Sequence, residues 1–461
     1  MPFSIPEAQS FGMDVEEFAR KALSSGRSDA RVEADLEKRI RSCKPGADPG
    51  WVKEFARAVI QEVKNTSGLA GDFFVVRPSG VSMGEFGVGS RGTGDFFAHR
   101  QIARIIGRTG ASVGVEEMDD AGAVSIPGAA GSGLQLVCTV DGMHSRLSDF
   151  PFLAGFHVTR ATLRDAYVMG ARPLLVFSDI HVADDGDVAK IFDYTAGICT
   201  VGEAMGVPLV TGSTLRIGGD MVLGSRMTGC VGAVGVAERL TARREAKPGD
   251  VVLMTEGAGG GTIATAALYS GYPWIVEHTI NLHFLRASEA LLASPALAKV
   301  HAMTDVTNGG LRGDAHELAG TARCRVVIEE EKVAGLVQED VGEMLEALSI
   351  DYLGVSLDAL LLTAPGSAVP EICSVIEGAG VRVAEVGRIE EGSPGAVLVS
   401  GGTASDFVPR FRESAYTPVK KVVDRRERDF AEMKQAVEEA AGAALAKKAR
   451  VLQRLRGQGK A

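Results

Sequence analysis

Four acidic side chains stand beside apolar segments, at positions suited to binding a divalent metal. Asp119 and Asp120 precede the segment AGAVSIPG, Asp141 follows the apolar run LQLVCTV, and Asp165 lies in the helix-like stretch FLAGFHVTRATLRDAYVMG. Mg²⁺ is usually held by one or two carboxylates together with phosphate oxygens, so carboxylates that converge in space would suit it. Taken singly, each of these residues is also typical of a turn or a helix cap.

A glycine-rich segment, GEFGVGSRGTGD, runs from Gly84 to Asp95. Such a segment lets backbone N–H groups approach phosphate oxygens, and an arginine within it would add positive charge. It lacks the G-K-[ST] ending of a Walker A loop and the spacing of a Rossmann fingerprint. A loop without a ligand would look similar. The candidate cofactor-binding residues here are Gly87, Gly89, Arg91, Gly92 and Gly94.

Two further motifs each allow a functional and a structural interpretation. Gly212, Ser213 and Thr214 follow the apolar segment MGVPLV, where small residues contact phosphate or simply turn the chain. The helix-like stretch that carries Asp165 ends in M-G-A-R-P, and its charges would also suit a surface salt bridge between Asp165 and Arg160 or Arg164.

The histidines show no spacing typical of a metal site. His144 stands three residues after Asp141, and His99 follows the glycine-rich segment. Either would be placed to contact a substrate, but a structural role is favoured for both.

Composition limits the classes of protein that these motifs fit. The chain has 461 residues, of which 57 are Gly and 45% are apolar, so most of it is expected to fold, in two or three domains. The net charge is −10, which disfavours nucleic-acid binding, although residues 418–461 carry 12 Lys and Arg against six Asp and Glu. No C-x-x-C pair, secretory leader or long apolar run is present, which favours a cytoplasmic protein.

The pattern along the chain predicts four regions. Residues 1–72 are expected to form a helical extension, with Asp48 and Pro49 starting one helix. Alternating strand-like and helix-like segments predict an α/β domain over 73–240 and a second over 241–400. Residues 401–461 are expected to form an irregular linker and a basic C-terminal helix.

Taken in order, the motifs resemble the PurM-like superfamily. The matching pieces are D-D-A-x-A-V, V-D-G-M, R-D-x-x-x-M-G-A-R-P, T-G-S-T and K-P-G-D-V-V-L, followed by M-T-D-V-T-N-G-G-L at 303–311. The superfamily contains aminoimidazole ribonucleotide synthetase, thiamine monophosphate kinase, selenophosphate synthetase and the hydrogenase maturation factor HypE. The resemblance covers roughly residues 85–400.

The resemblance implies an α/β fold of two domains, with a β-barrel built at a homodimer interface by the N-terminal domains. ATP would lie in a cleft, with Mg²⁺ joining its phosphates to carboxylates. Residues 87–94 would cover the phosphates, and residues 212–214 would line the nucleotide site. The implied metal ligands are Asp119 or Asp120, Asp141 and Asp165, and the implied catalytic residues are Asp141, Asp165, Asp305 and Asn308, the last two facing the cleft from the second domain.

Departures from the superfamily restrict the reaction. Residues 84–95 contain neither the Cys nor the Lys of selenophosphate synthetases, and the last cysteine, Cys373, is far from the C-terminus that carries the reactive cysteine of HypE. The leading hypothesis is a Mg²⁺- and ATP-dependent kinase, transferase or ligase that phosphorylates or activates a small metabolite. The alternative is an ATP-binding maturation or assembly factor, with little turnover, that docks a partner protein through its extra helices. Neither hypothesis involves a membrane.

Overall fold

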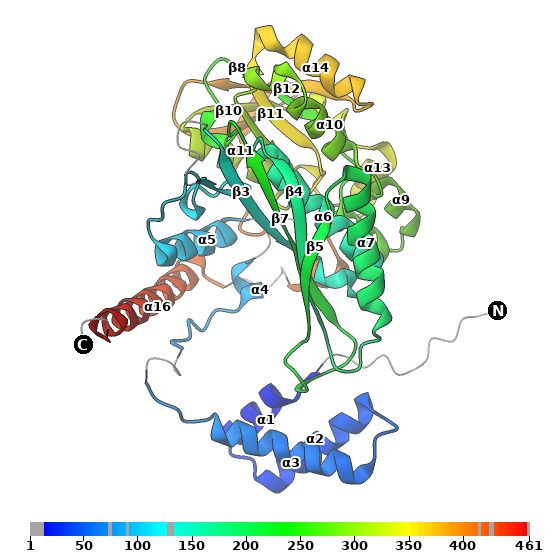
Figure 1. The fold of residues 1–461 in the computed structure, drawn as a ribbon, viewed down its shortest axis with the longest axis vertical. Coiled ribbons are helices and arrows are strands. Elements are labelled where there is room, and N and C mark those ends of the chain that lie inside the picture. The colour runs from blue at the N-terminus through cyan, green and yellow to red at the C-terminus, as the bar shows by residue number, and fades with distance from the viewer. Residues whose placement is uncertain are drawn as a thin grey trace, which may run out of the picture.

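The computed structural model describes residues 13–71, 76–88, 92–126, 133–413, 416–423 and 428–458. Its first part is a group of three helices with a hydrophobic core of its own (Figure 1). The Asp48 carboxylate accepts a hydrogen bond from the N–H of Trp51 at 2.9 Å, which confirms the predicted helix start. A short strand pair and the Lys44 ammonium, which contacts Asp184 and Asp185, join this group to the rest. The elements are α1 (Val15–Ser24), α2 (Asp29–Cys43), α3 (Pro49–Asn65), β1 (Met13–Asp14) and its partner β6 (Val222–Leu223).

The second part is a mixed five-stranded sheet in the order β2-β3-β7-β4-β5. The strands are β2 (Gly122–Ser125), β3 (Gln135–Gly142), β4 (Arg172–Val182), β5 (Leu209–Arg216) and β7 (Met227–Ala237). Two long helices, α6 (Pro151–Val168) and α7 (Ala189–Met205), pack against it. Among the described residues the sheet stays open, so the barrel implied by the resemblance is absent from the single chain.

The third part is a mixed seven-stranded sheet in the order β14-β13-β10-β12-β8-β11-β9. The strands are β8 (Asp250–Thr255), β9 (Ala302–Asp305), β10 (Arg325–Glu329), β11 (Leu360–Pro365), β12 (Val383–Glu390), β13 (Gly395–Ser400) and β14 (Thr403–Asp406). The helices around it are α8 (Gly261–Ser270), α9 (Val276–Thr279), α10 (His283–Leu292), α11 (Gly310–Ala322), α12 (Glu330–Ala334), α13 (Glu339–Ala347) and α14 (Val369–Gly378).

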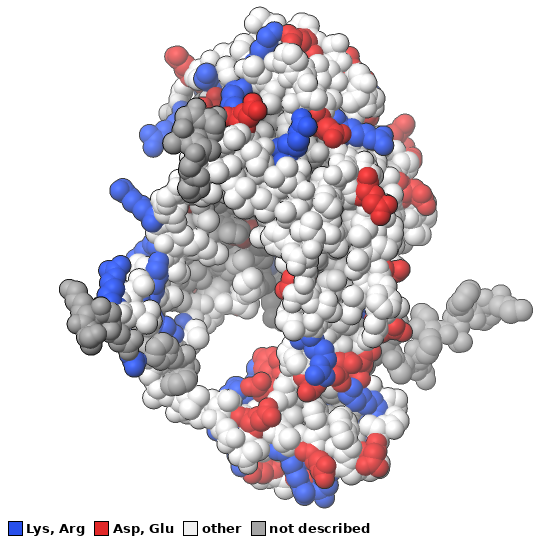
Figure 2. Space-filling model, in the orientation of Figure 1, with Lys and Arg blue, Asp and Glu red and all other residues white. Residues whose placement is uncertain are grey.

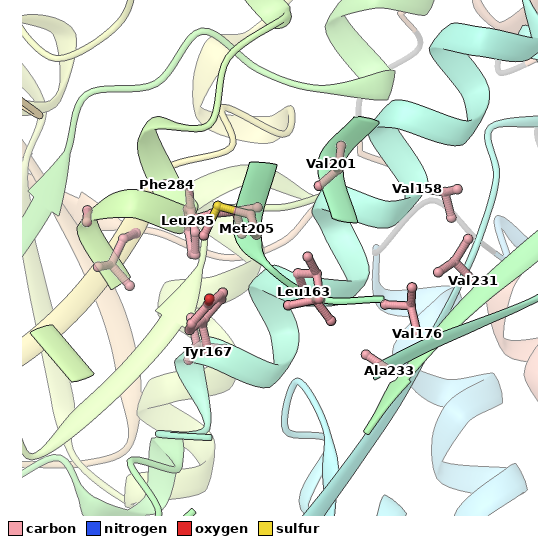
Figure 3. Close-up of a cluster of buried hydrophobic side chains, with 14 of the residues drawn as sticks. Val158, Leu163, Tyr167, Val176, Val201, Met205, Val231, Ala233, Phe284 and Leu285 are labelled. Atoms are coloured by element: carbon pink, nitrogen blue, oxygen red, sulfur yellow. The ribbon is translucent and has the colours of Figure 1, made fainter. Parts of the chain in front are cut away.

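Helix α6 joins the two sheets because most of its side chains are buried, and these include His157, Arg160 and Arg164 as well as apolar residues. Leu163 and Tyr167 of α6 lie between Val176 of the first sheet and Phe284 of α10 (Figure 3). One hydrophobic core therefore extends through both α/β parts. Side chains of α6 that could take part in chemistry therefore lie on a helix that is packed against both α/β parts.

The chain ends in α15 (Pro418–Val423) and the long helix α16 (Phe430–Gln458), which lies beside α5 (Thr93–Ile106) (Figure 1). Met433 of α16 packs on Phe97 of α5 and on Phe86 of the one-turn helix α4 (Met83–Phe86). The C-terminal helix thus covers the region of the glycine-rich segment. The prediction of an irregular linker from residue 401 is wrong over β14 (Thr403–Asp406), because this strand pairs with β13.

Candidate functional site

A cavity of about 560 Å³ lies at the edge of β3 and is lined by all four carboxylates that the sequence singled out. Strand β2 pairs with β3 only as far as Cys138, so the rest of that edge opens into the cavity. Asp119 and Asp120 approach it from the segment before β2. Asp141 comes from the end of β3, and Asp165 from α6.

Asp165 lies close to other carboxylates. Thr139 of β3 donates its hydroxyl to Asp165 at 3.1 Å. Burial, followed by the negative charges of Asp141 and Asp305, raises the pKa of Asp165 well above its usual value. Each like charge opposes ionisation of the others, whereas the charge of the neighbouring Arg164 favours ionisation of Asp165.

Asp120 is already engaged by a buried arginine. Arg243 lies with Nη2 2.5 Å from Asp120 Oδ1, and Thr304 donates its hydroxyl to Oδ2 at 2.8 Å. Asp119 accepts backbone N–H bonds from Asp120 and Arg243, both at 3.0 Å. Both oxygens of Asp119 therefore accept backbone N–H bonds, and the positive charge of Arg243 also acts on this carboxylate.

Asp305 and Asn308 lie in the same segment, and of the two only Asn308 lines one of the described cavities. Asp305 is 1% exposed and forms an ion pair with Arg164 of α6. Asn308 lines a second, smaller cavity, where it accepts a hydrogen bond from the hydroxyl of Thr262 at 2.7 Å. Asp305 thus holds the two α/β parts together.

The surface salt bridge considered for Arg160 or Arg164 with Asp165 is wrong. Both arginines are at least nine-tenths buried, and both pair with Asp358 of the second α/β part. Burial opposes the charge of Arg164, but the carboxylates of Asp305 and Asp358 more than offset it and raise its pKa. A sequence gives no direct sign of such pairs, because their members are far apart along the chain.

The glycine-rich segment is described in part, because Gly89 and Arg91 lie outside the described residues. A Cβ atom on Gly92 would stand 2.3 Å from the carbonyl oxygen of Phe411, and one on Gly94 would stand 2.0 Å from that of Phe86. Both glycines are therefore required by packing. Gly87 has a φ of 70°, which glycine adopts without strain.

Gly212, Ser213 and Thr214 do not lie with the carboxylates within one chain. They are on β5, at the other end of the strand order from β2 and β3. They line a separate cavity of about 350 Å³ beside α7. The expectation of a single nucleotide cleft is not met by these residues in the chain alone.

Other residues also line the main cavity, and sequence reasoning either does not single them out or favours a structural role for them. His99 lines it and lies with Nδ1 3.4 Å from Asp95 Oδ1, whereas a structural role was favoured from the sequence. Glu317 of α11 and Phe177 of β4 also line it. No spacing links these residues to the acidic motifs, so the fold is needed to find them.

The carboxylates around the main cavity suit Mg²⁺ only if phosphate oxygens supply the remaining metal ligands. Among the residues that the structure describes, no group of three or more His, Cys, Asp or Glu side chains is close enough to hold a metal ion. Mg²⁺ usually takes one or two carboxylates and fills its other positions with water and phosphate oxygens. Asp119, Asp141 and Asp165, spaced around one cavity, suit that kind of shared site.

Each of the two α/β parts matches a known protein family. Residues 118–237 match the family described as AIR synthase related protein, N-terminal domain, and residues 247–400 match the C-terminal domain of the same description. In the part of the chain that the structure describes, no helix has the length and apolar character needed to cross a membrane.

One relative extends the match to nearly the whole chain. Uncharacterized protein MJ1416 of Methanocaldococcus jannaschii is 49% identical over 96% of this chain and 98% of its own length. Selenide, water dikinase of Myxococcus xanthus is 28% identical over 63% of this chain and 87% of its own. Thiamine-monophosphate kinase of Pyrococcus horikoshii is 27% identical over 52% and 73%.

Solved structures share the fold at low sequence identity. HypE in its complex with HypF has a TM-score of 0.54 and 17% identity, covering 67% of this chain and 98% of that one. HypE in complex with ATP has a TM-score of 0.51 and 18% identity, covering 68% and 94%.

Proposed function

The chain belongs to the AIR synthase-related protein family, and from this premise we propose that it is a Mg²⁺-dependent enzyme that uses ATP to phosphorylate or activate a small metabolite. The observation that carries the proposal is the meeting of Asp119, Asp141 and Asp165 around one cavity of about 560 Å³. Relatives named for kinase and dikinase activity, and a solved relative that holds ATP, support it.

In this proposal the protein positions and neutralises phosphates, which is most of what phosphoryl transfer requires. Asp119, Asp141 and Asp165 would hold Mg²⁺, which when bound supplies positive charge to the phosphate oxygens. Asp120 is a positioning residue, because Arg243 and Thr304 occupy its oxygens. Contact between the glycine-rich segment and the phosphates is proposed for Gly87, Gly89, Arg91, Gly92 and Gly94, of which Gly89 and Arg91 lie outside the described residues.

We also propose a homodimer joined through the open face of the five-stranded sheet. Exposed apolar side chains of that sheet include Val124, Val140, Leu174, Phe177 and Val210. In Figure 2 the surface over β3, β4 and β5 is drawn almost wholly in white, so it carries little charge. An exposed apolar area of this kind is typical of an interface.

The dimer would also explain why residues 212–214 lie apart from the carboxylates within one chain. β3 and β5 are separated by two strands within one sheet. A second copy laid across the open face would bring its own β5, with Gly212, Ser213 and Thr214, toward the carboxylates of the first. The barrel implied by the resemblance would then form between the two chains.

Calorimetric titration of ATP into the full chain, with Mg²⁺ and with EDTA, tests the proposal. We expect binding that needs Mg²⁺ and that is weakened at least tenfold in Asp141→Asn. Asp193→Asn, an exposed change on α7, is the matched control and is expected to bind as the original chain does. Absence of ATP binding at millimolar Mg²⁺ would show the proposal to be wrong.

A second candidate is an assembly factor that binds ATP and docks a partner protein. It is favoured by α1–α3, which have their own core, and by the basic end of α16, coloured blue in Figure 2. The solved HypE–HypF complex supports it, because that relative binds another protein. Truncation after Ala446 removes the basic end while keeping Met433 in place. Loss of partner binding with unchanged ATP binding would favour this candidate.

A further inference from the structure

Helix α5 carries an aspartate and a histidine next to the main cavity. Asp95 and His99 are four residues apart, a spacing that puts two side chains on the same side of a helix. Nδ1 of His99 lies 3.4 Å from Oδ1 of Asp95. His99 lines the main cavity, whereas Asp95 is fully buried. Nδ1 therefore faces a buried carboxylate, and Nε2, on the far side of the ring, remains for a ligand.

Helix α5 is packed from two directions. The ring of Phe96 stacks on His316 of α11, with the ring centroids 6.4 Å apart. The next residue, Phe97, packs against Phe86 of α4 and Met433 of α16. Side chains that act on a substrate need a support of this kind, because small displacements from the required geometry weaken catalysis.

The surroundings of His99 differ from those of a structural histidine. A structural histidine is normally buried, with its ring nitrogens hydrogen-bonded inside the protein. The side chain of His99 is 43% exposed and forms part of the cavity wall. It is therefore accessible to a molecule bound in the main cavity.

Most other groups around this cavity that could accept a proton already have another role. The acidic side chains that line it are Asp119, Asp120, Asp141, Asp165 and Glu317. Three of them are the proposed metal ligands, and the other two form ion pairs with Arg243. Burial raises the pKa of the Cys138 thiol, so the thiolate that could accept a proton is disfavoured. Of the residues described around the cavity, His99 is the best placed to take a proton from a substrate.

We propose that His99 is the general base of the reaction, that Asp95 positions it, and that the phosphoryl acceptor is a hydroxyl group. This inference rests on the function proposed above. A general base assists only where the attacking atom carries a proton, as a hydroxyl group does and an ionised carboxylate does not.

In the proposed step, Nε2 of His99 takes the hydroxyl proton while the hydroxyl oxygen forms a bond to the γ-phosphorus of ATP. The bond between that phosphorus and the β,γ-bridging oxygen breaks, and its electron pair leaves on ADP. The products are a phosphate ester and ADP, and the imidazolium then releases its proton to water. Asp95 keeps the other ring proton on Nδ1 and stabilises the positive charge that forms on the ring.

Chemical modification tests the position of His99 without any turnover. Diethyl pyrocarbonate adds an ethoxycarbonyl group to accessible histidines, and peptide mass spectrometry measures each site in the full chain. Mg²⁺ with adenylyl imidodiphosphate, an ATP analogue that resists hydrolysis, is expected to protect His99. His283, an exposed histidine of α10, is the control and is expected to react as before. Equal modification of His99 with and without the analogue would overturn the inference.

Turnover tests the proposed role of His99, with water as the hydroxyl acceptor in hydrolysis of Mg²⁺–ATP. His99→Gln is expected to lower kcat about 100-fold, with the KM for ATP unchanged. Imidazole added to His99→Ala is expected to restore part of the rate, because it can fill the space that the ring leaves. His283→Gln is the matched control and is expected to keep the original rate. Hydrolysis by His99→Gln at the original rate would overturn the inference.

Asp95→Asn tests the positioning role, because it removes the charge and keeps the shape of the side chain. It is expected to lower kcat while the KM for ATP stays the same. Imidazole is not expected to restore this variant, since the ring of His99 still occupies the position. A lower melting temperature with an unchanged kcat would show that Asp95 is structural and would overturn its assigned role.

The failures of the two proposals are distinguishable. If ATP binds in a Mg²⁺-dependent way but His99 is neither protected nor needed for hydrolysis, the general base is overturned and the ATP-dependent function stands. If ATP does not bind at millimolar Mg²⁺, the proposed function is overturned, and the role of His99 with it.

Discussion

Arg243 lies with Nη2 2.5 Å from Oδ1 of Asp120, and neither side chain is more than 3% exposed. The same guanidinium contacts Glu317 of α11 at 2.9 Å. Burial opposes the charge of Arg243, but Asp120 and Glu317 more than offset it and raise its pKa. One side chain thus ties the segment before β2 to the second α/β part, beside the main cavity.

Arg243→Met is expected to lower the free energy of unfolding by about 3–5 kcal/mol, because it leaves Asp120 and Glu317 as buried charges without their partner. Urea unfolding of the full chain measures this. Arg244→Met is the matched control, since Arg244 is 36% exposed and pairs with Glu117 near the surface. It is expected to cost less than about 1 kcal/mol. Equal losses in the two variants would contradict the assigned role of Arg243.

Asp165→Asn is expected to make the metal-free chain more stable and to weaken Mg²⁺–ATP binding at least tenfold. Burial and the charges of Asp141 and Asp305 oppose ionisation of Asp165, so removing its charge relieves repulsion. Thermal unfolding in EDTA checks the first effect, and calorimetric titration of ATP checks the second. A variant that is less stable and binds ATP normally would show Asp165 to be a structural residue.

The fold of this chain could be predicted further than its site. The spacing of apolar residues and the position of turn-forming residues predict β3, β4 and α6, because a buried face leaves a regular apolar pattern in the sequence. The central strand β7 was missed, since MTGCVGAVGVA contains three glycines and little alternation. A Cβ on Gly232 would stand 2.1 Å from the ring of Phe177, so close packing explains at least one of those glycines.

The candidate site shows a similar limit. The motifs locate Asp119, Asp141 and Asp165, and the structure brings them around one cavity. What motifs cannot show is which charges are already paired. Arg243 is 123 residues from Asp120, and Arg164 is 194 residues from Asp358. Such pairs depend on tertiary packing, so the fold was needed to find them.

The stability of the chain is expected to fall between pH 6.5 and pH 4, in part through His144. Burial, with Lys420 and Arg164, lowers the pKa of His144 from 6.5 to about 4. Between these values the unfolded chain binds a proton that the folded chain does not, so acid favours unfolding. His144→Gln is expected to reduce the pH dependence of urea unfolding in this range. His283→Gln, on an exposed histidine, should leave it unchanged, and equal effects would contradict the prediction.

Gly92→Ala is expected to lower the free energy of unfolding by about 1–3 kcal/mol and to expose the glycine-rich segment to protease. The added Cβ would stand 2.3 Å from the carbonyl oxygen of Phe411, and Thr93 N–H donates to Arg410 nearby at 3.0 Å. Gly110→Ala is the control, because a Cβ there meets nothing within 4 Å. Unchanged protection of residues 76–95 in Gly92→Ala would show that the C-terminal segment does not hold them.

Leu174→Asp is expected to convert the proposed dimer to a monomer. Leu174 is 52% exposed on the open face of the sheet, and a charge there would have to be desolvated in the interface. Val188→Asp is the control, since Val188 is 59% exposed at the start of α7. Light scattering measures the mass, and calorimetric titration measures ATP binding of the same samples. If Gly212, Ser213 and Thr214 reach the carboxylates from the second copy, the variant is expected to have the mass of one chain and a weakened affinity for ATP. If Leu174→Asp is monomeric and binds ATP normally, the nucleotide site is complete within one chain. The cavity at β3 then does not require residues from β5 of a second copy.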